Sequence, residues 1–182
     1  PSRVYVAGAS NGGAMATTMA CGHPQAFAAA ASMIMSLTKT MAEACKPIAP
    51  VPMLWMLGTA DPLVAYGGGK GEARHAVSGL LSASDTVAFW RRISRCELDD
   101  TGVVELPDRH TEDRSTVTRI SSRCPAGADV MLYRMNGGGH RMPGHAADAR
   151  MERLVERLLG PQNRDIDAAE EVWAFFARHR RP

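Results

Sequence analysis

The chain has 182 residues, of which 45% are hydrophobic and 22% charged, and this balance is typical of a folded globular domain. Its net charge of +2 is too small, and its charges too scattered, to indicate a nucleic-acid-binding surface. No apolar run reaches the roughly 18 residues that a membrane span needs. We therefore expect one domain over residues 1–182, with no nucleic-acid partner and no membrane span.

Strand and helix patterns alternate in the first half of the chain. Residues 3–7 predict a buried strand, and because proteins rarely begin in the middle of a core, we expect a segment upstream of this sequence. Residues 11–21 predict a helix of small residues, and residues 27–33 a second strand. A loop or short helix over residues 38–50 leads to the apolar run Val51–Leu57, which is typical of a fully buried strand.

The second half continues this alternation. Ser84 or Asp85 is expected to cap a helix that runs to about Arg95, and residues 99–114 are polar and irregular. The remaining predicted elements are strands and helices over residues 116–122, 129–135, 151–159 and 167–176. This order predicts an α/β fold with a mostly parallel sheet flanked by helices.

Residues 8–12, Gly-Ala-Ser-Asn-Gly, match the pattern G-x-S-x-G between a strand and a helix. This is the context of a nucleophile elbow, a strained turn that lifts a serine hydroxyl above the edge of a sheet. Glycine at positions 8 and 12 is expected to avoid a clash with neighbouring backbone. The turn predicts Ser10 as the nucleophile and the backbone N–H of Asn11 as one oxyanion donor. An ordinary glycine-rich turn is the alternative.

A serine hydroxyl needs a general base to act as a nucleophile at neutral pH. Of the six histidines, His140 is the strongest candidate for this base. It follows a buried strand and the run Gly137-Gly138-Gly139, so it is expected at the carboxyl edge of the sheet, beside Ser10. His145 is its rival. The other histidines are expected at a helix end or in polar, exposed stretches, at positions 23, 75, 110 and 179.

The base in turn needs a carboxylate that fixes its tautomer. Asp61 follows the third predicted strand and falls between Ser10 and His140 in the chain, which is the order expected of this fold. Asp148 is a weaker rival, and a turn role beside Pro62 is the structural alternative. No His, Asp or Glu cluster has the spacing of metal ligands, so neither a metal nor another cofactor is expected.

The four cysteines stand at positions 21, 45, 96 and 124, and none belongs to a C-x-x-C pair. Of the three disulfide pairings, the sequential one, Cys21–Cys45 with Cys96–Cys124, is preferred because it closes two local loops. Two disulfides would indicate an exported protein, either secreted or periplasmic. Four buried thiols in a cytosolic enzyme are the alternative.

Residues 8–15, 58–62 and 137–140 together resemble the feruloyl esterase and polyhydroxybutyrate depolymerase family of α/β-hydrolases. Further segments agree with this family, at residues 86–90, 165–168 and 173–176. Cys96 and Cys124 stand where members of the family commonly carry a disulfide.

The resemblance implies a secreted serine esterase whose triad is Ser10, Asp61 and His140. It implies cleavage of short-chain, hydroxycinnamoyl or polyester esters through an acyl-enzyme. The family's N-terminal half, which carries several strands and the second oxyanion donor, is absent here, so the first strand is expected to be an open edge. That edge is expected to pair with a second copy of the chain or with a separate N-terminal fragment.

Local departures from the family accompany the resemblance. Leu57 stands where the family usually has histidine, which removes a polar contact near the acid loop. Residues 141–144 replace Thr-Trp-Pro-Gly by Arg-Met-Pro-Gly, and residues 141–162 are expected to form a helical insertion whose amphipathic helix packs on the surface or serves as a lid. The rivals to an esterase are a truncated, non-catalytic module and, among enzymes, a lipase or a prolyl-type peptidase.

Overall fold

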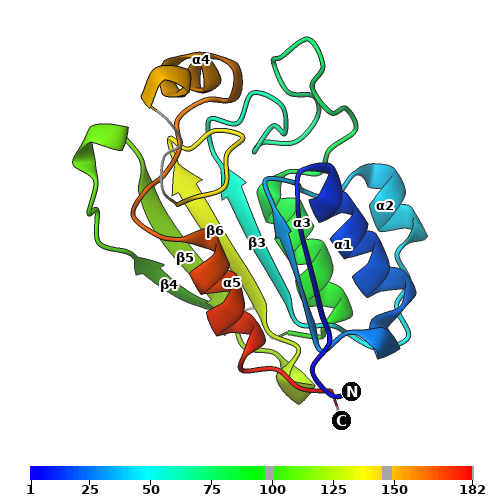
Figure 1. The fold of residues 1–182 in the computed structure, drawn as a ribbon. Helices are drawn as coiled ribbons and strands as arrows, with labels where there is room; N and C mark the ends of the chain where they lie inside the picture. Colours follow the sequence, from blue (N-terminus) through cyan, green and yellow to red (C-terminus); the bar gives the residue numbers. More distant parts are fainter. Residues whose placement is uncertain (97–100, 145–148, 182) are drawn as a thin grey trace.

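The structure is a computed structural model, and it describes residues 1–96, 101–144 and 149–181 (Figure 1). Its sheet has six strands in the order β1-β2-β3-β6-β5-β4. The strands are β1 (Tyr5–Ala9), β2 (Ala29–Met33), β3 (Met53–Gly58), β4 (Thr101–Glu105), β5 (Thr116–Ser122) and β6 (Val130–Asn136). The pairs among β1, β2, β3 and β6 are parallel, whereas β5 and β4 pair antiparallel, so the sheet is mixed.

The helices of the described residues are α1 (Asn11–Gly22), α2 (Lys39–Ala44), α3 (Ala83–Ile93), α4 (Ala149–Leu159) and α5 (Ala168–Phe176). Helices α1 and α3 cover one face of the sheet, and α5 covers the other (Figure 1). Helix α4 lies above the ends of β5 and β6, away from both faces (Figure 1). The chain is therefore an α/β protein with a sheet between two helical layers.

Strand β3 shows why its sequence is apolar at every position. Met53 and Trp55 belong to the core on the α1 and α3 side, whereas Leu54 and Met56 belong to the core under α5. Successive side chains of a strand point to opposite faces, so a strand with a helical layer on each face needs apolar residues throughout. The prediction of a fully buried strand over residues 51–57 is confirmed, with the strand itself running over Met53–Gly58.

Strand β4 lies in the segment 99–114, which the sequence predicts to be irregular, and that prediction is wrong for residues 101–105. Val103 and Val104 are exposed, so no alternation of buried and exposed residues marks the strand. It exists because its backbone pairs with β5, where Val103 is in register with Ile120. Pairing with a distant segment is not encoded in a local pattern.

Two helix starts can be compared with their predicted caps. Helix α3 is capped by Ser82, whose Oγ accepts the backbone N–H of Asp85 at 3.0 Å, so the prediction of Ser84 or Asp85 as the cap is wrong. Helix α5 starts after Asp167, whose Oδ1 accepts the N–H groups of residues 169 and 170. This cap is the predicted one.

The disulfides of the structure are those of the sequential pairing. Cys21–Cys45 joins the last turn of α1 to the residue after α2, with Cα atoms 5.5 Å apart. Cys96–Cys124 joins the chain after α3 to the turn between β5 and β6. None of the helices that the structure describes combines the length and the apolar composition of a membrane-spanning segment.

Candidate active site

Three side chains from three loops meet at the carboxyl ends of the parallel strands. The Nε2 atom of His140 lies 2.9 Å from Ser10 Oγ, and its Nδ1 atom lies 2.8 Å from Asp61 Oδ2. When Nδ1–H donates to the carboxylate, the lone pair of Nε2 is left to accept the serine proton. The contacts therefore connect a hydroxyl, an imidazole and a carboxylate in one line.

Ser10 occupies the turn between β1 and α1, where its backbone has φ 53° and ψ −121°. A non-glycine residue with positive φ is strained, and such strain is characteristic of a nucleophile elbow. The backbone N–H of Ser10 donates to Met33 O of β2 at 2.9 Å, which holds the turn against the sheet. Asn11, the first residue of α1, is exposed beside it, and its N–H belongs to the first helical turn, where intrahelical acceptors are missing.

The carboxylate of Asp61 divides its two oxygens between two tasks. Oδ1 accepts the backbone N–H groups of Leu63 and Val64, each at 2.8 Å, and so closes the turn after β3. Oδ2 remains for His140. The turn role and the proposed acid role are thus compatible in one residue, because each oxygen has its own partners. The side chain is buried, with 1% of its surface exposed, which shields the contact from water.

The loop of Asp61 and the loop of His140 are also joined through their backbones. Ala60 N–H donates to Gly138 O at 2.9 Å, and Gly137 N–H donates to Thr59 Oγ1 at 2.8 Å. These bonds follow directly from β3 and β6 being neighbours in the sheet. Parallel neighbours bring their carboxyl ends to one edge, so the acid and the base need little further positioning.

The backbone at Gly139 and His140 is hydrogen-bonded to the end of α4 and the residues just after it. His140 N–H donates to Leu159 O at 2.5 Å, and Gly139 N–H donates to Pro161 O at 2.7 Å. A side chain on Gly139 would place its Cβ 2.1 Å from Leu159 O, so the two segments touch backbone to backbone. The base loop therefore contacts the segment 141–162, which the family resemblance predicts to be an insertion.

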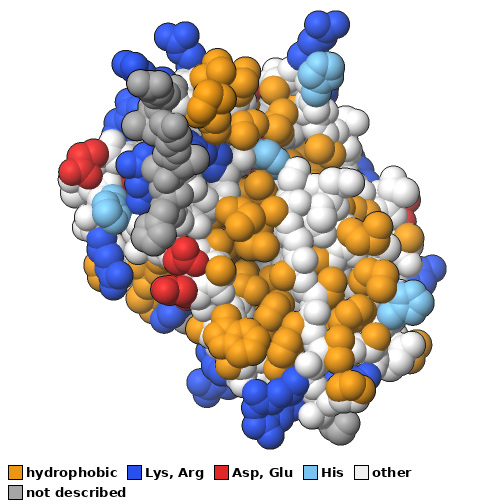
Figure 2. Space-filling view, in the orientation of Figure 1, with side chains coloured by type: hydrophobic (Ala, Val, Ile, Leu, Met, Phe, Trp, Pro, Cys, Tyr) orange, Lys and Arg blue, Asp and Glu red, His pale blue; other side chains and the backbone are white. Residues whose placement is uncertain are grey.

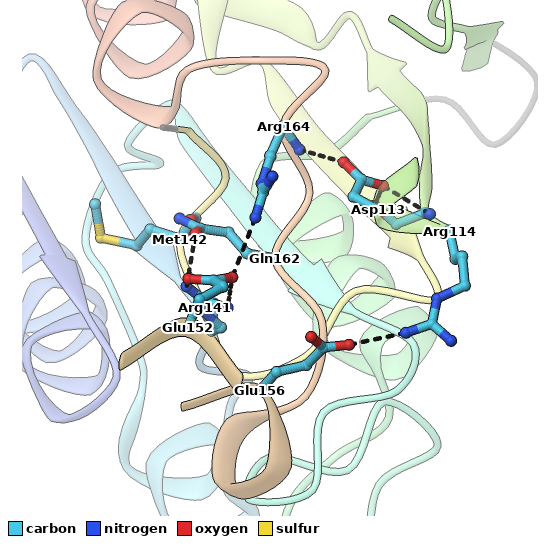
Figure 3. Close-up of polar contacts among 9 residues, drawn as sticks. Asp113, Arg114, Arg141, Met142, Glu152, Glu156, Gln162 and Arg164 are labelled. Carbon is cyan, nitrogen blue, oxygen red and sulfur yellow. Dashed lines mark hydrogen bonds and ion pairs between the residues drawn. The ribbon is translucent and has the colours of Figure 1, made fainter. Parts of the chain in front are cut away.

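An ion-pair cluster next to the base was not predicted from the sequence. Arg141 donates to Glu152 at 2.7 and 2.9 Å, and Arg164 donates to the same carboxylate at 3.2 Å (Figure 3). The hydrogen bond from Arg141 lowers the pKa of Glu152, although partial burial acts against this shift. The signal available in the sequence was the Arg141 that replaces the family's threonine.

The other histidines and Asp148, which were considered as alternatives to His140 and Asp61, lie in different surroundings. His145 and Asp148 lie outside the described residues. His23 follows the end of α1, and His75 and His110 are exposed, as predicted. His179 is buried against Phe175, so the prediction of an exposed position is wrong, and its burial lowers the pKa of the imidazole.

Leu57, where the family resemblance predicts histidine, is buried and in register with Arg134 of β6. Arg134 donates to Thr118 Oγ1 at 3.1 Å, and its positive charge acts on Tyr66 of the acid loop. Burial raises the pKa of the Tyr66 hydroxyl, and Arg134 opposes that rise. Leu57 itself offers no polar atom in its side chain, so the expected lack of a polar contact at this position stays a prediction.

A cavity of about 460 Å³ lies between α1 and α2 and is lined in part by Thr17, Leu37 and Met41. The disulfide Cys21–Cys45 forms part of its wall, and none of the three triad positions does. Ser10 is half-buried and lies at the carboxyl end of β1, at the start of α1.

Comparisons with known proteins find relatives that are named as esterases. Feruloyl esterase B of Piromyces equi is 32% identical over 146 residues, which cover 77% of this chain and 25% of that protein. "Putative esterase NocK" of Nocardia uniformis subsp. tsuyamanensis is 31% identical over 189 residues, which cover 97% of this chain and 51% of that protein. The comparisons support an esterase family.

The similarities cover only part of each relative. The chain spans between a quarter and about half of the length of the curated relatives it matches. No protein-family model matches it. Among the described residues, no group of three or more His, Cys, Asp or Glu side chains is placed to hold a metal ion.

Proposed function

We propose that this chain is the catalytic part of a serine carboxylic-ester hydrolase of the α/β-hydrolase fold. The observation that carries the proposal is the line of contacts from Ser10 Oγ through His140 to Asp61, at 2.9 and 2.8 Å. It is supported by the strained backbone at Ser10 and by relatives named as esterases. Under this proposal, residues 1–182 form one domain with a helical insertion at about 141–162.

The first half of the reaction is transfer of the acyl group to Ser10. Its Oγ attacks the ester carbonyl carbon while the hydroxyl proton moves to His140 Nε2. The carbonyl oxygen of the tetrahedral intermediate accepts a hydrogen bond from the N–H of Asn11. The bond to the leaving oxygen then breaks, and His140 gives its proton to the departing alcohol.

The second half is hydrolysis of the acyl-enzyme. Water attacks the acyl carbon, its proton moves to His140, and the bond to Ser10 breaks as the serine oxygen recovers a proton. Asp61 stays ionised throughout and stabilises the imidazolium that forms twice. The products are one carboxylic acid and one alcohol.

The substrates proposed are short-chain, hydroxycinnamoyl or polyester esters. The relative named feruloyl esterase B supports an aromatic acyl group, whereas Met142, in place of the family's tryptophan, makes the wall beside the base aliphatic. Rates for p-nitrophenyl esters of rising acyl length, measured beside methyl ferulate, separate these classes. The disulfides support a secreted or periplasmic location.

The test of the reaction is the variant Ser10→Ala assayed with p-nitrophenyl butyrate. Loss of a nucleophile that acts together with its base lowers kcat by about 10⁴- to 10⁶-fold. Circular dichroism of the variant checks that the fold is kept. Unchanged hydrolysis by the folded variant would exclude Ser10 as the nucleophile.

A further inference from the structure

Helix α4 exposes much of its apolar row, whereas its two glutamates are half-buried. Met151, Leu154 and Leu158 are 53%, 52% and 63% exposed. The amphipathic pattern of residues 151–159 predicts the opposite orientation, with the apolar row against the protein. A helix that turns leucine toward water exposes a surface that typically has a ligand or partner.

Ion pairs hold the polar side of α4 against the protein (Figure 3). Glu152 contacts Arg141 and Arg164, and the side chains of Glu152 and Arg141 are only 16% and 8% exposed. One turn further along, Glu156 accepts a hydrogen bond from Arg114 at 2.9 Å. Both helix carboxylates thus pair with arginines from outside the helix, and the less exposed pairs of Glu152 fix which side of α4 faces water.

The exposed side of α4 is basic as well as apolar. Arg153 precedes Leu154, and Arg157 precedes Leu158 four residues later. Positions four apart lie on one side of a helix, so two cations run beside two leucines. All four side chains are exposed. Helices that combine a row of cations with an apolar stripe typically bind the surface of anionic lipid aggregates.

The end of α4 lies beside the proposed active site. The end of α4 holds the backbone of His140 through Leu159 O, one residue after Leu158. Met142, two residues past the base, is 38% exposed, and its side chain points away from the ion-pair cluster (Figure 3). Figure 2 shows hydrophobic side chains gathered over the top of the molecule, where α4 lies, with Lys and Arg beside them.

A second copy of the chain does not suit this surface. A stable dimer buries about 800 Å² on each partner, more than one side of an isolated 11-residue helix supplies. The open strand β1 lies at the other end of the sheet from β5 and β4, and α4 stands on the β5–β6 side (Figure 1). A strand added at β1 would therefore leave α4 uncovered.

We propose that α4 is an interfacial helix that binds an anionic lipid–water surface and so brings Ser10 to esters held in that surface. The proposal rests on the esterase function proposed above and narrows where its substrates are found: esters held at the surface of a negatively charged lipid aggregate. Met151, Leu154 and Leu158 enter the apolar layer, while Arg153 and Arg157 pair with anionic headgroups. The ion pairs of Glu152 hold the helix in this orientation.

The test is co-sedimentation of the whole chain with vesicles of ether-linked phosphatidylglycerol, which contain no ester for the proposed reaction to cleave. Ether-linked phosphatidylcholine vesicles are the neutral comparison. The variants are Leu154→Gln with Leu158→Gln, and Arg153→Gln with Arg157→Gln. The matched control is Ile48→Gln with Val103→Gln, which removes two exposed apolar side chains away from α4.

We expect the parent chain to bind phosphatidylglycerol at least about tenfold more strongly than phosphatidylcholine. Each α4 double variant should reduce this binding about tenfold or more, and the control should not. Hydrolysis of soluble p-nitrophenyl acetate should be unchanged in both α4 variants.

The proposal is overturned if the parent does not bind the anionic vesicles, or if the control loses as much binding as the leucine variant. It is also overturned if light scattering shows a dimer that the leucine variant dissociates, because a second copy would then cover α4. Failure of the proposed function has a different signature: the parent binds the vesicles but does not hydrolyse p-nitrophenyl acetate, or its hydrolysis survives Ser10→Ala.

Discussion

Gly8 and Gly12 face each other across the turn of Ser10, and a side chain on Gly8 would place its Cβ 2.1 Å from Gly12 O. A Cβ on Gly12, by contrast, would meet no atom within 4 Å. The interpretation that both glycines avoid a clash is therefore correct for Gly8 and wrong for Gly12. Only the first glycine is required by the close approach of the two backbones.

This difference predicts opposite effects for two alanine variants. Gly8→Ala should lower the free energy of unfolding by about 2–4 kcal/mol and abolish ester hydrolysis, because backbone must move at the nucleophile. Gly12→Ala should leave stability unchanged or raise it by up to about 1 kcal/mol, since alanine favours the helix. Urea unfolding of both variants checks this, and equal destabilisation would contradict it.

Asp61→Asn should lower kcat for p-nitrophenyl butyrate by about 10³- to 10⁴-fold while the chain stays folded. The amide oxygen stays on the N–H groups of Leu63 and Val64, so an NH2 group replaces Oδ2, and it can neither accept the Nδ1–H of His140 nor stabilise the imidazolium. The control is Asp108→Asn, an exposed aspartate, which should keep full activity. An Asp61→Asn variant within tenfold of the parent would remove Asp61 from the proposed triad.

The ion pairs of Glu152 with Arg141 and Arg164 anchor α4, and the stability of this contact should depend on pH. The pKa of Glu152 lies below its usual value of 4.5 because of Arg141. A lowered folded-state pKa means that the stabilisation is complete above about pH 4.5 and is lost as the pH falls through the folded pKa. Glu152→Gln should lose about 1–3 kcal/mol of local stability at neutral pH, and less in acid.

Hydrogen exchange of the α4 amides, compared between parent and variant at each pH, measures this effect. Glu156→Gln is the matched control one turn away, because its partner Arg114 is 76% exposed and such a pair contributes little. Equal effects of the two substitutions would show that the buried cluster is not the anchor.

Strand β1 is predicted to pair with another strand, from a second copy or from an N-terminal fragment. Val4 O and Ser10 N both bond to the β2 side, so alternation directs the N–H of the exposed Ala7 outward. Ala7→Pro removes that donor and should abolish the association. Size exclusion with light scattering checks it, and a monomeric parent without a second peptide would contradict it.

The sequence was most informative where one local pattern determines the structure. The turn around Ser10, the strand before Asp61 and the glycine run before His140 each predict a position at the same sheet edge, and parallel topology brings those positions together. The elbow, the acid loop and the base loop could thus be placed without coordinates.

The sequence was least informative where contacts with distant residues determine the local structure. Strand β4 depends on pairing with β5, and the burial of His179 depends on packing against Phe175. The periodicity of α4 shows an apolar side but not which side packs, because Arg141 and Arg164, outside the helix, select the orientation through Glu152. These outcomes are set by tertiary contacts, which no short window contains.

The most direct test of the central claim is labelling of the chain with a fluorophosphonate, followed by peptide mapping by mass spectrometry. This reagent bonds to a serine whose hydroxyl is activated by a neighbouring base. The proposed triad predicts one adduct, on Ser10, in the parent chain and none in His140→Ala. The absence of a Ser10 adduct in the folded parent, or equal labelling in His140→Ala, would contradict it.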